Sequence, residues 1–436
     1  MHLRTDDIAA AVGGLHHGPV VEVAGAAIDS REVRGGELFV ALVAERDGHE
    51  FIAQAMDAGA FAALCARRQP GDRTAILVDD TDAALLDLGR LARRRLPDRV
   101  IAVTGSVGKT TVKDLTAAAV RTRHRTAASV RSFNNERGVP LTLVGAADDV
   151  EVVVVEMGAR GRGHIALLCD VARPTVAVVT LVALAHAEMF GTIDEVAAAK
   201  AELVEALPPD GTAVLNADDA LVAAMARQTD GAVVTYGVEH TGADVHAEAI
   251  ALDDELRPRF RLRSPWGDAD VRLAVRGAHQ VGNALAAATA AMVIGVEPPA
   301  VAEGLRNAEL SPWRMSLERG TTGIVVLNDA YNANPTSMAA ALDALASLPA
   351  RRRVAVLGVM AELGPDSDFE HRRVADYAEQ LGIEVLAVDA PEYERRTVAD
   401  VKAALEVLSD LGDGDAVLVK GSRVAGLETL AEELTR

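Results

Sequence analysis

Residues 103–113 read VTGSVGKTTVK, and they follow the apolar run RVIA at 99–102. An apolar strand that enters a helix through a glycine-rich turn is the context of a phosphate-binding loop. Backbone N–H groups and the helix N-terminus would present partial positive charge to a phosphate. Lys109 adds a full charge, and the Thr110 hydroxyl can ligate Mg²⁺. The alternative is a plain glycine turn beside a solvated lysine. The predicted loop comprises Gly105, Ser106, Val107, Gly108, Lys109, Thr110 and Thr111.

Composition and charge restrict the class of protein. The chain has 436 residues, of which 50% are hydrophobic and 3% aromatic, as in globular domains with aliphatic cores. Its formal net charge of -20 disfavours a nucleic-acid or anionic-membrane surface. Cys65 and Cys169 lie too far apart in sequence for a metal-ligand spacing, which favours buried thiols in a reducing compartment. The N-terminus is too acidic for a signal peptide and no apolar run could span a membrane, so we expect a cytoplasmic protein.

The pattern of strands and helices predicts an α/β fold with three domains. Residues 1–98 combine strand-like pieces with an Ala-rich helical piece at 51–64. Residues 99–310 contain continuous β-branched runs between helical patterns, which indicates a central parallel-sheet ATPase domain covered on both faces. Within it, residues 244–275 predict an antiparallel addition. Residues 311–436 repeat the alternation as a Rossmann-like domain.

Three further side chains are candidates for the chemistry beside the loop. Glu156 ends the run VEVVVVE and should lie at the carboxyl edge of the sheet, where it could ligate Mg²⁺. His186 follows the next strand and reaches the same edge, although a lone histidine is more often structural. Lys200 lies in a helical pattern, and its spacing alone indicates a surface lysine.

Several motifs together resemble the Mur ligases. These are TGSVGKTT, SFNNERGVPLTL, EMGARGRGHIALL, LNADD, GAHQVGNALAAA, NDAYNANPTSM and VLVKGS, in that order along nearly the whole chain. The resemblance implies a ligase that activates a peptide carboxylate with ATP as an acyl phosphate, which an amine then converts to an amide. The stretches at 132–140 and 329–338 are most characteristic of members that join D-alanyl-D-alanine to UDP-N-acetylmuramoyl-tripeptide.

The resemblance also implies roles for individual residues. The loop around Lys109 would hold the ATP phosphates, Thr110 and Glu156 would bind one Mg²⁺, and His186 would lie near a second. Lys200 matches a lysine that is carbamylated in the family. The other implied positions are Asn283 at the adenine, Arg314, Asp329 and Asn332 where the third domain closes on the nucleotide, Ser30 and Arg31 at the uridine nucleotide, and Asn134, Asn135 and Thr142 in a loop facing the substrate.

The sequence also departs from the family pattern. Leu181 and Ala183 replace an asparagine and a glycine before His186, Val359 replaces an acidic residue, and Asp389 stands where glycine is common. Two alternatives therefore stay open. One is a diverged ligase for another carboxylate and amine; the other is a nucleotide-binding switch without ligation. For the ligase that the resemblance implies, we expect small-molecule substrates as partners, no nucleic acid, no membrane and a monomer.

Overall fold

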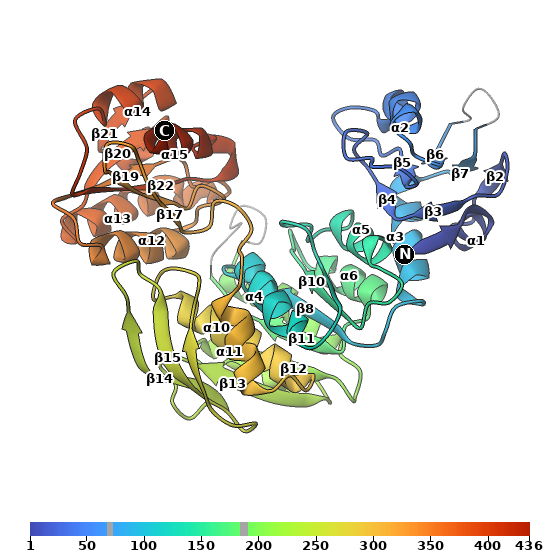
Figure 1. Ribbon diagram of the computed structural model, residues 1–436, viewed down its shortest axis with the longest axis horizontal. Helices are drawn as coiled ribbons and strands as arrows, with labels where there is room; N and C mark the ends of the chain where they lie inside the picture. The colour runs from blue at the N-terminus through green and yellow to red at the C-terminus, as the bar shows by residue number, and fades with distance from the viewer. Residues whose placement is uncertain (68–72, 184–190) are drawn as a thin grey trace.

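The computed structural model describes residues 1–67, 73–183 and 191–436. Figure 1 shows the described parts as a V. The central part of the chain forms its base, the N-terminal part forms one arm, and the C-terminal part forms the other. The two termini therefore lie in different arms.

The N-terminal arm contains a five-stranded sheet in the order β2-β7-β6-β5-β4, beside the antiparallel pair β1-β3. The predicted helix over 51–64 is wrong in its second half. Gly59 adopts a φ of +110°, after which the chain enters β6 between β5 and β7. The elements are β1 His2–Arg4, α1 Thr5–Ala11, β2 Leu15–His17, β3 Glu22–Ala24, β4 Ala26–Ala27, β5 Leu38–Val40, α2 Ile52–Asp57, β6 Ala62–Cys65, β7 Ala75–Leu77 and α3 Thr81–Arg93.

The base is built on a nine-stranded sheet in the order β16-β15-β14-β13-β12-β11-β8-β10-β9. Its strands are parallel from β9 to β14, and β14, β15 and β16 pair antiparallel, as the sequence predicted. The strands are β8 Val100–Thr104, β9 Thr126–Ala128, β10 Val152–Glu156, β11 Val176–Val179, β12 Thr212–Asn216, β13 Ala232–Gly237, β14 Val245–Leu252, β15 Pro258–Arg263 and β16 Ala269–Arg272. The helices are α4 Lys109–Arg121, α5 Gly138–Gly145, α6 His164–Ala172, α8 Ile193–Glu205, α9 Ala220–Ala224, α10 Gln280–Val293 and α11 Pro298–Arg306.

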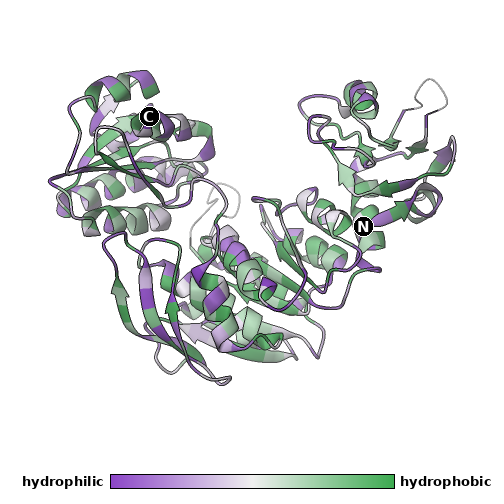
Figure 2. Cartoon of the chain, in the orientation of Figure 1, coloured by the Kyte–Doolittle hydropathy of each residue, from purple (hydrophilic) through white to green (hydrophobic). Residues whose placement is uncertain are grey.

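Side chains of the central sheet alternate between two cores. On β8, Val100 and Ala102 join the core that includes α3, α6 and α8, whereas Ile101 and Val103 join the core that includes α4, α10 and α11. Figure 2 shows hydrophobic strands between helices of mixed character. The β-branched runs are continuous because both faces of these strands are buried. Strand order also reverses at β8, with β9 and β10 on one side and β11 on the other, and such sheets bind ligands at the carboxyl end of the reversal.

The C-terminal arm contains a six-stranded sheet in the order β17-β18-β22-β19-β20-β21, with β17 antiparallel to β18. Helices cover both faces, because alternate residues of β19 join different cores. The elements are β17 Ser316–Arg319, β18 Val325–Asn328, α12 Pro335–Ser347, β19 Arg352–Leu357, α13 Ser367–Gln380, β20 Glu384–Val388, β21 Arg396–Val398, α14 Val401–Val407, β22 Asp415–Lys420 and α15 Glu428–Thr435. Among the residues described, no helix is long and apolar enough to cross a bilayer.

Candidate active site

The predicted phosphate loop connects the carboxyl end of β8 to the first residue of α4. Gly105 and Gly108 have φ values of +147° and +84°, a region that disfavours other residues. A Cβ on Gly105 would also lie 1.9 Å from the Thr180 Oγ1 atom. Both glycines are therefore required by the backbone path.

Neighbouring backbone fixes the loop. The Ser106 N–H donates to the Leu181 carbonyl at 2.8 Å, and the Ser106 hydroxyl donates to the Ala183 carbonyl at 2.8 Å. The Thr180 hydroxyl donates to the Val107 carbonyl at 2.6 Å. Leu181 and Ala183, two departures from the family pattern, thus contact Ser106 through main-chain atoms that any residue provides.

Lys109 folds back over this loop. Its Nζ atom donates to the Gly105 carbonyl at 2.8 Å and to the Ser106 carbonyl at 3.2 Å. Burial lowers the pKa of Lys109, the Arg314 guanidinium lowers it further, and the Glu156 carboxylate opposes both. The ammonium group is thus held in a positively charged corner, where an anionic ligand would relieve the repulsion.

Arg314 reaches this corner from the linker that leads into the C-terminal arm. Its Nη2 atom donates to the Thr110 hydroxyl at 2.9 Å. Its guanidinium also lies over the Tyr331 ring, 4.2 Å from the ring centroid, and its buried Nε atom has no hydrogen-bond partner in the part of the chain that the structure describes. The arginine therefore connects the phosphate loop to the C-terminal arm and keeps one donor available.

Glu156 ends β10 and is 1% exposed. Its Oε1 atom accepts a hydrogen bond from the Asn134 amide at 2.8 Å, whereas its buried Oε2 atom has no partner among the described residues. A buried carboxylate oxygen without a donor is costly unless a cation or proton neutralises it. Glu156 and the Thr110 hydroxyl both offer oxygen atoms, which are the ligands that Mg²⁺ prefers. Within the described ranges, no three His, Cys, Asp or Glu side chains form a metal cluster.

Lys200 lies on α8 and is 3% exposed, so the structure corrects the spacing-based expectation of a surface lysine. Burial and, to a smaller extent, the charge of Lys109 lower its pKa from 10.5 to about 7, against an opposing effect of Glu202. A large part of its amine is therefore neutral near neutral pH. His186 lies outside the described residues.

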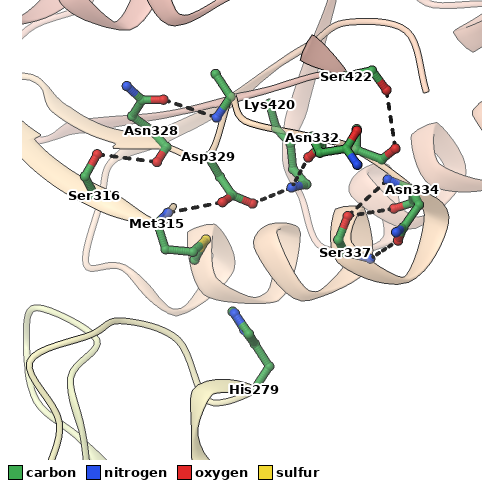
Figure 3. Close-up of polar contacts among 12 residues, drawn as sticks. His279, Met315, Ser316, Asn328, Asp329, Asn332, Asn334, Ser337, Lys420 and Ser422 are labelled. Carbon is green, nitrogen blue, oxygen red and sulfur yellow. Dashed lines mark hydrogen bonds and ion pairs between the residues drawn. The ribbon is translucent and has the colours of Figure 1, made fainter. Parts of the chain in front are cut away.

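A polar cluster in the C-terminal arm faces the base (Figure 3). Asp329 accepts a hydrogen bond from the Met315 N–H at 3.1 Å and forms an ion pair with Lys420, whose Nζ atom also donates to the Asn332 carbonyl at 2.9 Å. His279 points toward this cluster from the base. Burial lowers the pKa of His279; Asp329 opposes this change and Lys420 adds to it. Sequence reasoning missed Lys420 and His279 as site residues, although both lie in motifs that carried the family resemblance.

Asn283 lies on α10 at the far side of the loop. Its amide donates to the Gln280 Oε1 atom at 2.8 Å, and its Oδ1 atom lies 2.6 Å from where a Cβ on Gly108 would be. The helix that carries Asn283 therefore packs directly against the phosphate loop, which explains the requirement for glycine at 108.

One cavity of about 620 Å³ unites most of the predicted residues. It lies between the base and the C-terminal arm. The predicted residues that line it are Ser106, Val107, Gly108, Lys109, Thr110, Thr111, Asn134, Asn135, Glu156, Lys200, Asn283, Arg314, Asp329 and Asn332. The cavity thus combines a phosphate loop, a buried carboxylate and several cationic side chains from two domains.

Three predicted substrate residues are not among the described lining of this cavity. Ser30 is buried in the N-terminal arm, where its hydroxyl donates to the Gln54 Oε1 atom at 3.2 Å. Arg31 is exposed and pairs with Asp29. The expectation that Thr142 lies in a loop is wrong: it lies on α5, and its hydroxyl donates to the Gly138 carbonyl at 2.9 Å.

Comparisons with known families agree with this site. Residues 103–291 match the Mur ligase middle domain, and residues 313–423 match the Mur ligase glutamate ligase domain. The chain belongs to the Mur ligase family, as the sequence predicted, and it is an ATP-dependent ligase that forms amide bonds. Both matched segments contribute residues to the cavity.

Individual relatives narrow the class. UDP-N-acetylmuramoyl-tripeptide--D-alanyl-D-alanine ligase of Mycobacterium tuberculosis is 40% identical, over 93% of this chain and 91% of the relative. The Escherichia coli enzyme of the same name is 36% identical, over 93% of this chain and 92% of the relative. The structure of MurF from Acinetobacter baumannii has a TM-score of 0.90 and 30% identity, over 100% of this chain and 99% of that chain. MurF ligase from Thermotoga maritima in complex with ADP has a TM-score of 0.82 and 28% identity, over 95% of this chain and 97% of that chain.

Proposed function

We propose that this chain uses ATP to join D-alanyl-D-alanine to UDP-N-acetylmuramoyl-tripeptide through an acyl phosphate, in the synthesis of a cytoplasmic peptidoglycan precursor. The observation that carries the proposal is the single cavity shared by Lys109, Glu156, Lys200 and Arg314. Relatives that share most of the chain carry the name of this reaction. The chemistry requires two anions, the carboxylate and the γ-phosphate, to approach each other, and this cavity supplies the positive charge that permits it.

The nucleotide would bind across the base and the C-terminal arm. The backbone amides of residues 105–111 and the Lys109 ammonium would hold its phosphates. Asn283 would contact the adenine, while Asp329 and Asn332 would contact the nucleotide from the other side of the cavity. The similar Thermotoga maritima enzyme was solved in complex with ADP, which supports the binding of an adenine nucleotide by this chain.

Magnesium fits the oxygen donors of the site. Thr110 and Glu156 would hold one ion, and a second would lie near His186 and Lys200. When bound, the ions neutralise charge on the phosphate oxygens. The unpartnered Oε2 atom of Glu156 supports the first position, because a cation there would satisfy a buried charge.

Lys200 is the proposed site of carbamylation. Its neutral amine would attack CO₂, which forms an N–C bond and releases a proton. The product is an anion beside Lys109, so the repulsion that now lowers the pKa of Lys200 would become attraction. Burial also limits the access of water, which favours a stable modification over a transient one.

The UDP-linked substrate would span the base and the N-terminal arm. Ser30 and Arg31 would hold the uridine nucleotide, and Asn134 and Asn135 would face the peptide end in the cavity. Thr142 has a different position: its Oγ1 atom lies 3.3 Å from the Ser129 hydroxyl, which can donate to it and which accepts from the Glu156 N–H at 3.2 Å. We therefore propose that Thr142 supports the strand end that carries Glu156. We also propose a monomer with domain boundaries at 98/99 and 310/311.

Release of inorganic phosphate from Mg²⁺-ATP tests the proposal. The purified protein receives UDP-N-acetylmuramoyl-tripeptide and D-alanyl-D-alanine separately and then together. Release only with both substrates supports the proposed reaction. If the protein binds ATP but releases no phosphate with either substrate or with both, the result would favour a nucleotide switch. Release with this carboxylate and a different amine would identify a diverged ligase.

A further inference from the structure

Four contacts fix the linker at residues 311–315, which joins the base to the C-terminal arm. The Ser311 N–H donates to the Asp114 Oδ2 atom at 2.8 Å, and Arg314 donates to the Thr110 hydroxyl at 2.9 Å. The Trp313 carbonyl accepts from the Tyr331 N–H at 3.3 Å, and the Met315 N–H donates to Asp329. The first two contacts attach the linker to α4, and the last two attach it to the C-terminal arm.

The linker is also strained on both sides of Arg314. Trp313 and Met315 have φ values of +59° and +53°, although neither is glycine. Bulky residues adopt this region only where the surrounding structure imposes it. Contacts on both sides hold these conformations: Trp313 and Met315 bind the C-terminal arm, and Arg314 between them binds α4.

The surroundings of Asp114 hold its carboxylate in position for the contact with Ser311. It lies four residues after Thr110, so both side chains project from one face of α4. Its Oδ1 atom pairs with the Lys113 Nζ atom at 2.5 Å, and that ammonium is almost completely buried and also donates to the Ser129 carbonyl at 2.8 Å. The carboxylate is thereby fixed by one partner while its other oxygen, Oδ2, accepts from the linker.

We propose that Asp114 is a positioning residue for Arg314: it fastens the linker to the phosphate-loop helix, so that the arginine reaches the nucleotide phosphates. The role rests on the proposed ligase function. Asp114 is not among the described residues that line the cavity. It acts through the linker, with α4 as the rigid spacer between the Asp114 contact and the Thr110 contact.

A double-mutant cycle tests this role. Ser311→Pro removes the N–H donor and leaves the buried Lys113–Asp114 pair intact, and Asp114→Ala removes the acceptor. A hydrogen bond to a charged group corresponds to about a tenfold change in an equilibrium constant. We expect each variant to lower kcat about tenfold in the wild-type background, and less than about twofold in an Arg314→Ala background. Glu309→Ala, which removes an exposed carboxylate two residues before the linker, is the matched control and should leave kcat unchanged in both backgrounds.

Trp313 provides a readout that needs no substrate. Its ring lies under the Arg423 guanidinium, 4.4 Å from it, and Trp266 is the other tryptophan of the chain. In a Trp266→Phe background, Ser311→Pro should increase acrylamide quenching of Trp313, whereas Glu309→Ala should not. The proposal would be overturned if kcat fell equally in the wild-type and Arg314→Ala backgrounds, or if Ser311→Pro left the quenching of Trp313 unchanged. A wild-type protein without phosphate release would refute the ligase function instead, and the quenching result would still decide whether Asp114 holds the linker.

Discussion

Replacing Lys200 by methionine should change how stability depends on pH. The lysine is 3% exposed, and burial lowers its pKa from 10.5 to about 7. Below pH 7 the folded and unfolded chains both carry the proton, so the full penalty of the buried charge is present. Between pH 7 and 10.5 the unfolded chain binds a proton that the folded chain lacks, so the free energy of unfolding rises with pH. With 1.36 kcal/mol per pKa unit, the gain from pH 7 to pH 9 is about 2 kcal/mol.

The assay is urea unfolding in CO₂-free buffer at pH 7 and pH 9, because CO₂ would convert the amine to an anion. The free energy of unfolding of Lys200→Met should exceed that of the wild type at pH 7. This difference should be about 2 kcal/mol smaller at pH 9. Lys402→Met, at an exposed lysine on α14, is the matched control and should show no narrowing. If the difference in free energy of unfolding between Lys200→Met and the wild type is the same at both pH values, the reasoning from burial is refuted.

Three further substitutions test the site. Lys109→Ala should lower phosphate release more than about a hundredfold while circular dichroism shows an intact fold; a nearly active variant would refute the loop assignment. Gly105→Ala places a Cβ 1.9 Å from Thr180 Oγ1 and should weaken ATP binding at least about tenfold by calorimetry, whereas Gly161→Ala, with no neighbouring atom within 4 Å, should bind normally. Lys200→Ala should lose most activity and regain part of it with added short carboxylic acids; a harmless substitution would contradict carbamylation.

Local sequence was sufficient for the parts of the molecule that depend on neighbouring residues. The phosphate loop was predictable because strand, glycines, lysine and helix are contiguous, and β8 ends and α4 begins around it as expected. The runs at β10 and β11 were recognised because burial on both faces demands apolar residues throughout. The helix at 51–64 was overextended because alanine favours helices, whereas the position of β6 is decided by its partners β5 and β7.

Contacts between segments that are distant in sequence could not be predicted from the pattern of apolar and polar residues. Lys420 and His279 are 141 positions apart, and only the folded chain shows that they face one another. The burial of Lys200 was equally invisible, because its helix carries charged residues around it. Asp389 is a departure from the family pattern that the structure explains. It has a φ of +48°, in the left-handed region, and aspartate tolerates this region better than most residues other than glycine.

The contact between Arg314 and Thr110 connects magnesium binding to the position of the C-terminal arm. The Thr110 hydroxyl now accepts from the guanidinium, and the same oxygen is the proposed Mg²⁺ ligand. An Mg²⁺ ion held by the Thr110 hydroxyl would repel the guanidinium. Mg²⁺-ATP would therefore compete with Arg314 for Thr110, and the arginine side chain would turn toward the phosphates that the loop holds. The linker that carries Arg314 is bound to Asp329 through the Met315 N–H, so nucleotide affinity and the position of the C-terminal arm should change together in any variant that loosens the contact between Arg314 and Thr110.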